Sequence, residues 1–132
     1  METELDFFEK KLMQMLLQGE DDTLSILREQ LANSTIKDRE VTGVGFYISF
    51  QVANNTLRTH KQAFAFGDVI ADINELEFGA GFLLFVNNGV LSTLEGYAHD
   101  GPWLYEKVTD FQLSYSTPTG KRDIEALKKI WQ

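Results

Sequence analysis

Apolar and polar residues alternate most regularly between Val44 and Val52. Every second residue of this segment is apolar, and the residues between them are glycine, tyrosine, serine and glutamine. A period of two places the apolar side chains on one side of a strand and the other side chains on its opposite side. The segment is therefore predicted to be a strand with one buried face.

Two short apolar runs, Phe82–Val86 and Val90–Leu94, are separated by an Asn-Asn-Gly sequence. Asn and Gly tolerate the positive φ of a type I′ turn, so this pattern predicts a tight hairpin. In that hairpin Asn87 is expected opposite Val90, and Phe85 opposite Ser92. Because the first run is apolar at every position, it is predicted to be a central strand covered on both faces.

Three further segments have strand character. The charged segment Thr35–Thr42 is predicted to be an edge strand or a lead-in to the sheet. The segment Gln62–Ile73 is interrupted at Gly67 and Asp68, which indicates a bulge or a break into two pieces. The alternation of Thr109–Tyr115 predicts a last strand.

Helical spacing of apolar residues predicts helices over Thr3–Leu17, Thr23–Ala32 and Lys121–Trp131. Thr3 is expected to cap the first helix, with Asp6 three residues later in a capping-box position. The first two helices are separated by a short gap and are expected to pack as an antiparallel pair.

The order of these elements predicts an α+β fold. It consists of an N-terminal helix pair, a mainly antiparallel sheet of five or six strands and a C-terminal helix, and the helices can cover one face of the sheet. The length of 132 residues is that of one domain with its own core, spanning residues 1–132.

Charge adds a constraint on partners. Twenty acidic against twelve basic residues give a formal net charge of −8. Nucleic acid binding requires a basic face, so this balance disfavours it, whereas it suits a basic protein partner. Many soluble proteins are simply acidic, and that is the plainer explanation of the charge.

The chain is expected to be cytoplasmic, with no membrane association. Its start, METELDFFEKK, lacks the basic and apolar regions of a signal peptide. No apolar run approaches the ~20 residues that cross a bilayer.

Motifs that carry chemistry are missing from the sequence. There is no cysteine, and the two histidines, His60 and His99, have no metal-ligand spacing. The sequence has neither a G-x-S-x-G nor a Walker spacing. No metal, cofactor or catalytic residue is therefore predicted, and an enzyme is disfavoured without being excluded.

The best candidate for a binding site is the loop predicted over residues 96–104, which contains two glycines and a proline. Binding residues tend to collect on such connections. Aromatic side chains with acidic neighbours suit an interface that faces a basic partner. In an alternative interpretation Trp103 and Tyr105 only cover the end of the sheet. The candidate binding residues are Glu95, Tyr97, His99, Asp100, Trp103, Tyr105 and Glu106.

The run GAGFLLFV at Gly79–Val86 and the sequence LEGY at Leu94–Tyr97 resemble a segment of small bacterial proteins of unassigned function. The size, the acidity and the lack of a catalytic motif are similar to those of bacterial toxin immunity proteins, including those of contact-dependent growth inhibition. This resemblance implies a non-catalytic cytoplasmic protein. It would neutralise a basic toxin C-terminal domain, most concretely a nuclease, by occluding its active site.

Two other functions remain open at this point. In the first, Glu95 and His99 converge in a pocket at the end of the sheet and serve a small enzyme or a ligand-binding protein. In the second, a free sheet edge pairs with its twin in a homodimer. A deep pocket containing both side chains would favour the first of these, and a flat acidic face would favour protein binding.

Overall fold

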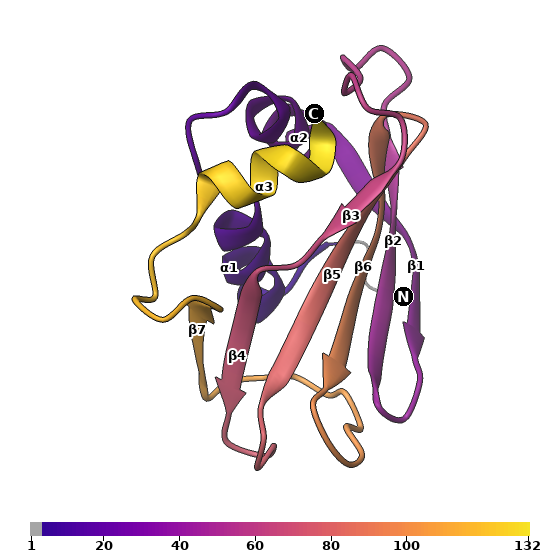
Figure 1. Cartoon of the computed structure of the whole chain (residues 1–132). Helices are drawn as coiled ribbons and strands as arrows, with labels where there is room; N and C mark the ends of the chain where they lie inside the picture. The colour runs from indigo at the N-terminus through magenta and orange to yellow at the C-terminus, as the bar shows by residue number, and fades with distance from the viewer. Residues whose placement is uncertain (1–3) are drawn as a thin grey trace.

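Three helices lie on one face of a seven-stranded sheet in the computed structural model, which describes residues 4–132 (Figure 1). The helices are α1 (Phe7–Leu16), α2 (Asp22–Ala32) and α3 (Ile124–Trp131). The predicted α+β class, with N-terminal helices and a C-terminal helix, is confirmed.

The sheet is antiparallel in every pairing between its named strands, and its order is β1-β2-β6-β5-β4-β7. It has more strands than the five or six predicted, because the segment broken at Gly67 forms two short strands, β3 and β4, that both pair with β5. The charged strand β1 lies at an edge, as predicted. The strands are β1 (Ser34–Val41), β2 (Gly45–Val52), β3 (Phe64–Phe66), β4 (Val69–Ile73), β5 (Ala80–Asn87), β6 (Val90–Ala98) and β7 (Phe111–Tyr115).

Local capping determines where the N-terminal helices begin. The Asp6 carboxylate accepts from the Glu9 amide at 2.9 Å, and the Glu9 carboxylate accepts from the Asp6 amide at 2.9 Å, which is a capping box. The first helix was therefore predicted with the wrong cap, and Thr3 lies outside the described residues. Asp21 caps α2 through its carboxylate, which accepts from the Thr23 and Leu24 amides.

The core lies between the helices and the sheet. It takes Phe46 and Ile48 from β2, and Phe82 and Leu84 from β5, all with at most 1% of their surface exposed. Phe8 of α1 packs on this layer, with its ring centroid 6.0 Å from that of Phe82. The alternation predicted for β2 is confirmed by its burial pattern.

The prediction that the first hairpin strand is covered on both faces is wrong. Strand β5 is central, but Phe82 and Leu84 face the helices while Leu83 and Phe85 are half-buried on the opposite face. The order of the elements correctly indicated helices on one face of the sheet, whereas the apolar run wrongly suggested that the second face of β5 is covered too.

The register of the hairpin also differs from the expected one. Asn87 pairs with Val90 as expected, but Phe85 pairs with Thr93 because Ser92 forms a bulge. Strand β6 then continues to Ala98, so the predicted loop over residues 96–104 begins later than expected.

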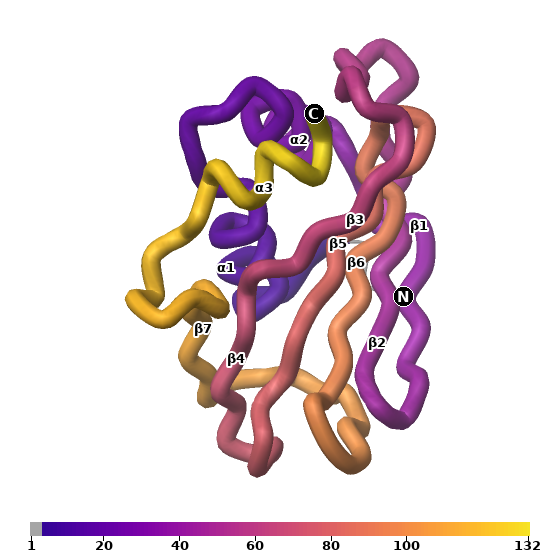
Figure 2. The backbone as a smooth tube through the Cα atoms, viewed as in Figure 1, coloured from indigo at the N-terminus to yellow at the C-terminus, as the bar shows by residue number. Residues whose placement is uncertain are grey.

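The two ends of the sheet carry different connections (Figure 2). At one end lie the β1–β2 turn, the β4–β5 turn and the loop that follows β6; we call this the turn end. At the other end the β5–β6 turn meets the 53–63 segment, where the Arg58 guanidinium donates to the Asn88 carbonyl at 2.9 Å.

Candidate functional site

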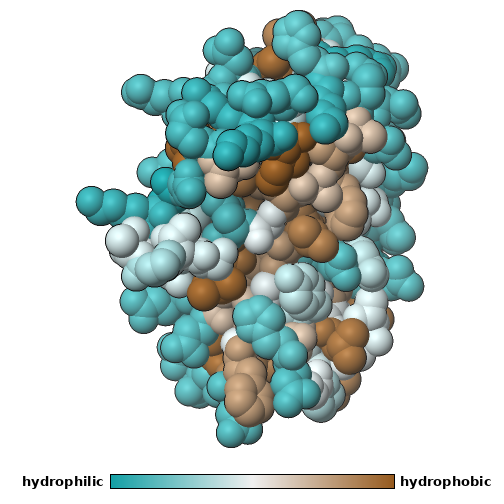
Figure 3. Space-filling view, in the orientation of Figure 1, coloured by the Kyte–Doolittle hydropathy of each residue, from teal (hydrophilic) through white to brown (hydrophobic). Residues whose placement is uncertain are grey.

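Within the described residues, no helix covers the side of the sheet opposite α1, α2 and α3, which we call the open face (Figure 1). Its centre carries Ile70 from β4, Leu83 and Phe85 from β5, and Tyr97 from β6, and all four side chains are half-buried. Figure 3 shows hydrophobic side chains gathered over the middle strands of the sheet. A partly exposed apolar band on a flat face is typical of an interaction surface.

Paired residues of neighbouring antiparallel strands point to the same face of the sheet, so their side chains form rows that cross the strands. On the open face, two such rows begin with an acidic residue on β1 and end with an apolar residue on β5. Strands lie about 4.8 Å apart, so a row over four strands spans about 14 Å. Neither row carries a lysine or an arginine. One row is Glu40, Tyr47, Glu95 and Leu83, and the next is Asp38, Ser49, Thr93 and Phe85, in the strand order β1, β2, β6 and β5. We call Asp38, Glu40 and Glu95 the acidic rim.

Glu95 is held in place on this face by its neighbour in the row. The Tyr47 hydroxyl donates to the Glu95 carboxylate at 3.1 Å, and this hydrogen bond raises the pKa of Tyr47. The predicted binding residue is therefore oriented and half-exposed, with a negative charge available beside the apolar band.

Tyr97 lies flat across the neighbouring strand because Gly81 has no side chain. A Cβ at position 81 would lie 2.6 Å from the Tyr97 hydroxyl oxygen. The His99 ring follows, with its centroid 6.0 Å from that of Tyr97, and its Nδ1 lies 2.9 Å from the Phe78 carbonyl oxygen. Tyr97 and His99 thus continue the open face towards the turn end.

Trp103 and Tyr105 lie on the helix side. Trp103 is 5% exposed, and the Phe46 ring centroid lies 5.7 Å from that of Trp103 and 4.1 Å from that of Tyr105. The two aromatic residues cover the end of the core, as the alternative interpretation expected. They are not brought together with Glu95 and Tyr97.

Asp100 and Glu106 are exposed at the turn end. Three exposed apolar residues from separate connections lie at the same end: Val44, Phe78 and Leu104, with 55%, 58% and 74% of their surfaces accessible. Val44 was predicted as the first apolar residue on the buried face of the alternating strand, but β2 begins at Gly45 and Val44 is exposed. Phe78 and Leu104 were not singled out from the sequence, because an isolated apolar residue in a loop carries no pattern.

Sequence reasoning also missed a buried charged cluster. Glu9 has none of its surface exposed, and its carboxylate oxygens accept from both terminal nitrogens of Arg39 at 2.7 Å and from the Tyr105 hydroxyl at 2.7 Å. Burial raises the pKa of Glu9, but the hydrogen bonds from Arg39, the Asp6 amide and Tyr105 outweigh burial and hold this pKa below its ordinary value. The cluster ties edge strand β1 and the segment after β6 to α1.

The pocket expected around Glu95 and His99 is not formed by these side chains. Glu95 lies in β6 and His99 directly follows the end of that strand, so they are four residues apart, about 13 Å in extended backbone, with Tyr97 between them. Five surface depressions in the described part of the chain are lined by neither residue.

Comparison of the chain with protein-family models, curated proteins and solved structures finds no match. Among residues 4–132, no group of three or more His, Cys, Asp or Glu residues could hold a metal ion. In the same range, none of the helices has the length and hydrophobicity needed to cross a bilayer.

Proposed function

We propose that this chain is a non-catalytic cytoplasmic module that binds a basic protein partner on its open face. The observation that carries the proposal is the pair of rows on a helix-free sheet face, which run from the acidic rim to Leu83 and Phe85 of the apolar band. An apolar centre bordered by polar groups is the usual arrangement of a protein interface.

The most concrete form of this function is that of an immunity protein. Nucleases bind polyanions through basic active sites, and an acidic face is complementary to such a site. The formal net charge of −8 adds long-range attraction to the local complementarity of the rim. In this function the open face covers the active site of the toxin and inhibits it by occlusion.

Co-expression tests this function directly. The C-terminal domain of the protein encoded by the gene immediately upstream is produced together with this chain. Cell survival and co-purification of the two proteins are measured. The wild-type chain should protect the cells and co-purify with the domain. The variant Glu40→Lys/Glu95→Lys should bind at least about 100-fold more weakly, because it turns attraction into repulsion at the rim.

The matched control is Glu20→Lys/Glu29→Lys, which changes the net charge equally at two exposed residues outside the sheet. It should protect and bind like the wild-type chain. An equal loss of binding in both double variants would show that the overall charge of the chain, and not the acidic rim, determines binding. Absence of any binding by the wild-type chain would refute the immunity function.

A further inference from the structure

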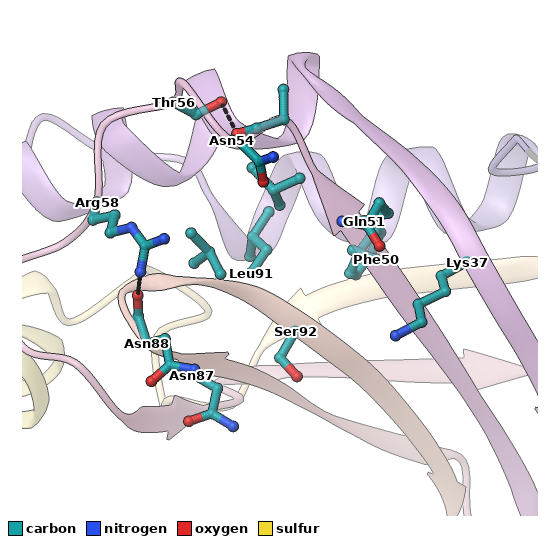
Figure 4. Close-up of a pocket in the computed structure, with 13 residues that line it drawn as sticks. Lys37, Phe50, Gln51, Asn54, Thr56, Arg58, Asn87, Asn88, Leu91 and Ser92 are labelled. Atoms are coloured by element: carbon teal, nitrogen blue, oxygen red, sulfur yellow. Dashed lines mark hydrogen bonds between the residues drawn. The ribbon is translucent and has the colours of Figure 1, made fainter.

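A polar cleft opens between β2 and β6 at the end of the sheet that carries the β5–β6 turn, opposite the turn end (Figure 4). The two strands pair only as far as Ser49 and Thr93. Beyond that pair β2 stays with β1 and β6 stays with β5, so the strands separate and leave a cavity of about 280 Å³.

Two β-bulges face this one cleft. In β1 the register shifts between Ile36 and Asp38, so Lys37 has no partner on β2. In β6 the register shifts so that Ser92 has no partner on β5. Both unpaired residues line the cleft. Bulges redirect side chains and are frequent beside binding sites. Two bulges at one cleft therefore support the assignment of a binding site.

The lining has the opposite charge to the rest of the protein. It contains Lys37 and Arg58, which Figure 4 shows at opposite sides of the cleft, and no aspartate or glutamate. In a chain with a formal net charge of −8, this is a local concentration of hydrogen-bond donors and positive charge. Within the described residues, the Lys37 ammonium has no hydrogen-bond or ion-pair partner. Gln51, Asn87 and Ser92 supply further polar groups between the two cations.

The walls of the cleft are fixed before any ligand binds. Gln30, which has none of its surface exposed, donates to the Leu57 and Gly89 carbonyls at 2.9 Å and accepts from the Leu91 amide at 2.8 Å. Arg58 donates to the Asn88 carbonyl from the other wall. A preformed site loses little conformational entropy when it binds a ligand.

We propose that this cleft binds a small organic anion through a carboxylate or phosphate group that pairs with Lys37, while Arg58 adds positive charge at the opposite side of the cleft. Lysine and the planar fork of arginine are the side chains that bind such groups most strongly. The cavity volume of about 280 Å³ is close to the ~300 Å³ at which drug-sized pockets begin, which suits a small ligand. The polar groups of Gln51, Asn87 and Ser92 face the uncharged part of the ligand.

The test is an NMR titration of the full chain at neutral pH and constant ionic strength. Inorganic phosphate and succinate are added separately, and the amide resonances of Asn87, Asn88 and Ser92 are followed. Saturable shifts at these residues are expected with at least one probe. Saturation by phosphate alone assigns a phosphate ligand, and saturation by succinate alone assigns a carboxylate.

Variants separate this site from general ion binding. Lys37→Gln should weaken binding at least about tenfold, because it removes a charge-assisted contact, and Lys37→Arg should retain binding. Lys129→Gln, at an exposed lysine of α3, should bind like the wild-type chain. Shifts that do not saturate, or that are unchanged in Lys37→Gln, would overturn the proposal. The titration contains no protein partner, so its outcome does not depend on the proposed function.

Discussion

Glu9 shows how a single buried charge can be accommodated in this protein. A carboxylate has about four acceptor positions, and four donors occupy them: the Asp6 amide, two nitrogens of Arg39 and the Tyr105 hydroxyl. Burying a charge is costly unless it is paired and hydrogen-bonded. The Glu9 side chain is therefore expected to be essential to the junction of α1, β1 and the segment after β6.

Replacing Glu9 with Gln should destabilise the fold by about 3 kcal/mol. The side-chain NH2 group introduced by the substitution is a donor and would face other donors, and the partly buried Arg39 loses its counter-charge. Urea unfolding at neutral pH measures this difference. Glu125→Gln is the control, since its ion pair with Lys128 is long, at 3.7 Å, and the Glu125 side chain is 81% exposed. It should cost less than about 0.5 kcal/mol. Equal costs for the two variants would contradict the role given to Glu9.

The lowered pKa of Glu9 also predicts a pH dependence. Below the ordinary value of 4.5, the unfolded chain takes up a proton on Glu9 while the folded chain keeps the charge. The stabilisation is therefore complete above about pH 4.5 and is lost as the pH falls towards the lowered folded-state pKa. Urea midpoints measured from about pH 6 to about pH 3 should fall less steeply for Glu9→Gln than for the wild-type chain. Parallel pH profiles would show that Glu9 is not the group responsible.

Strand β5 illustrates what a single element contributes to both faces of the sheet. Phe82 is fully buried against Phe8 and Phe46, whereas Phe85 is half-buried on the open face beside Thr93. The same residue type therefore has two functions on one strand, one in the core and one on the proposed binding surface.

Two alanine substitutions separate these functions. Phe82→Ala should destabilise the fold by about 3–5 kcal/mol, because it leaves a cavity in the core. Phe85→Ala should cost only about 1–2 kcal/mol, because the side chain is already partly in water, but it should weaken the binding of the partner. Thermal or urea unfolding measures the first effect, and titration with the partner measures the second. A loss of stability at Phe85 as large as at Phe82 would mean that the open face is covered.

The sequence predicted the elements better than their pairing. Alternation identified β2, and the Asn-Gly turn identified the β5–β6 hairpin with Asn87 opposite Val90. The register beyond Phe85 was not predictable, because the bulge at Ser92 has no signature in a run of apolar and hydroxyl residues. The covered side of β5 was also not predictable, because a strand that is apolar on both faces does not show where the helices pack.

At the scale of the whole molecule, charge and shape divide the surface into distinct regions. The open face has an apolar band and an acidic rim, while the cleft between β2 and β6 carries two cations in an acidic chain. Of the predicted binding residues, Glu95 and Tyr97 lie on the open face, and His99 extends it towards the turn end. Composition grouped Trp103 and Tyr105 with them, but the chain turns towards the helix side after Gly101, which sequence spacing alone does not reveal.

The central claim is that the partner docks on the open face, and methyl NMR of the complex tests it most directly. The methyl groups of Ile70 and Leu83 lie on the open face, while those of Ile48 and Leu84 are buried under the helices and serve as internal controls. Adding the C-terminal domain of the protein encoded by the upstream gene should shift or broaden the Ile70 and Leu83 signals. The Ile48 and Leu84 signals should stay nearly unchanged. Changes confined to the helix side, or no change at any of the four residues, would contradict the account.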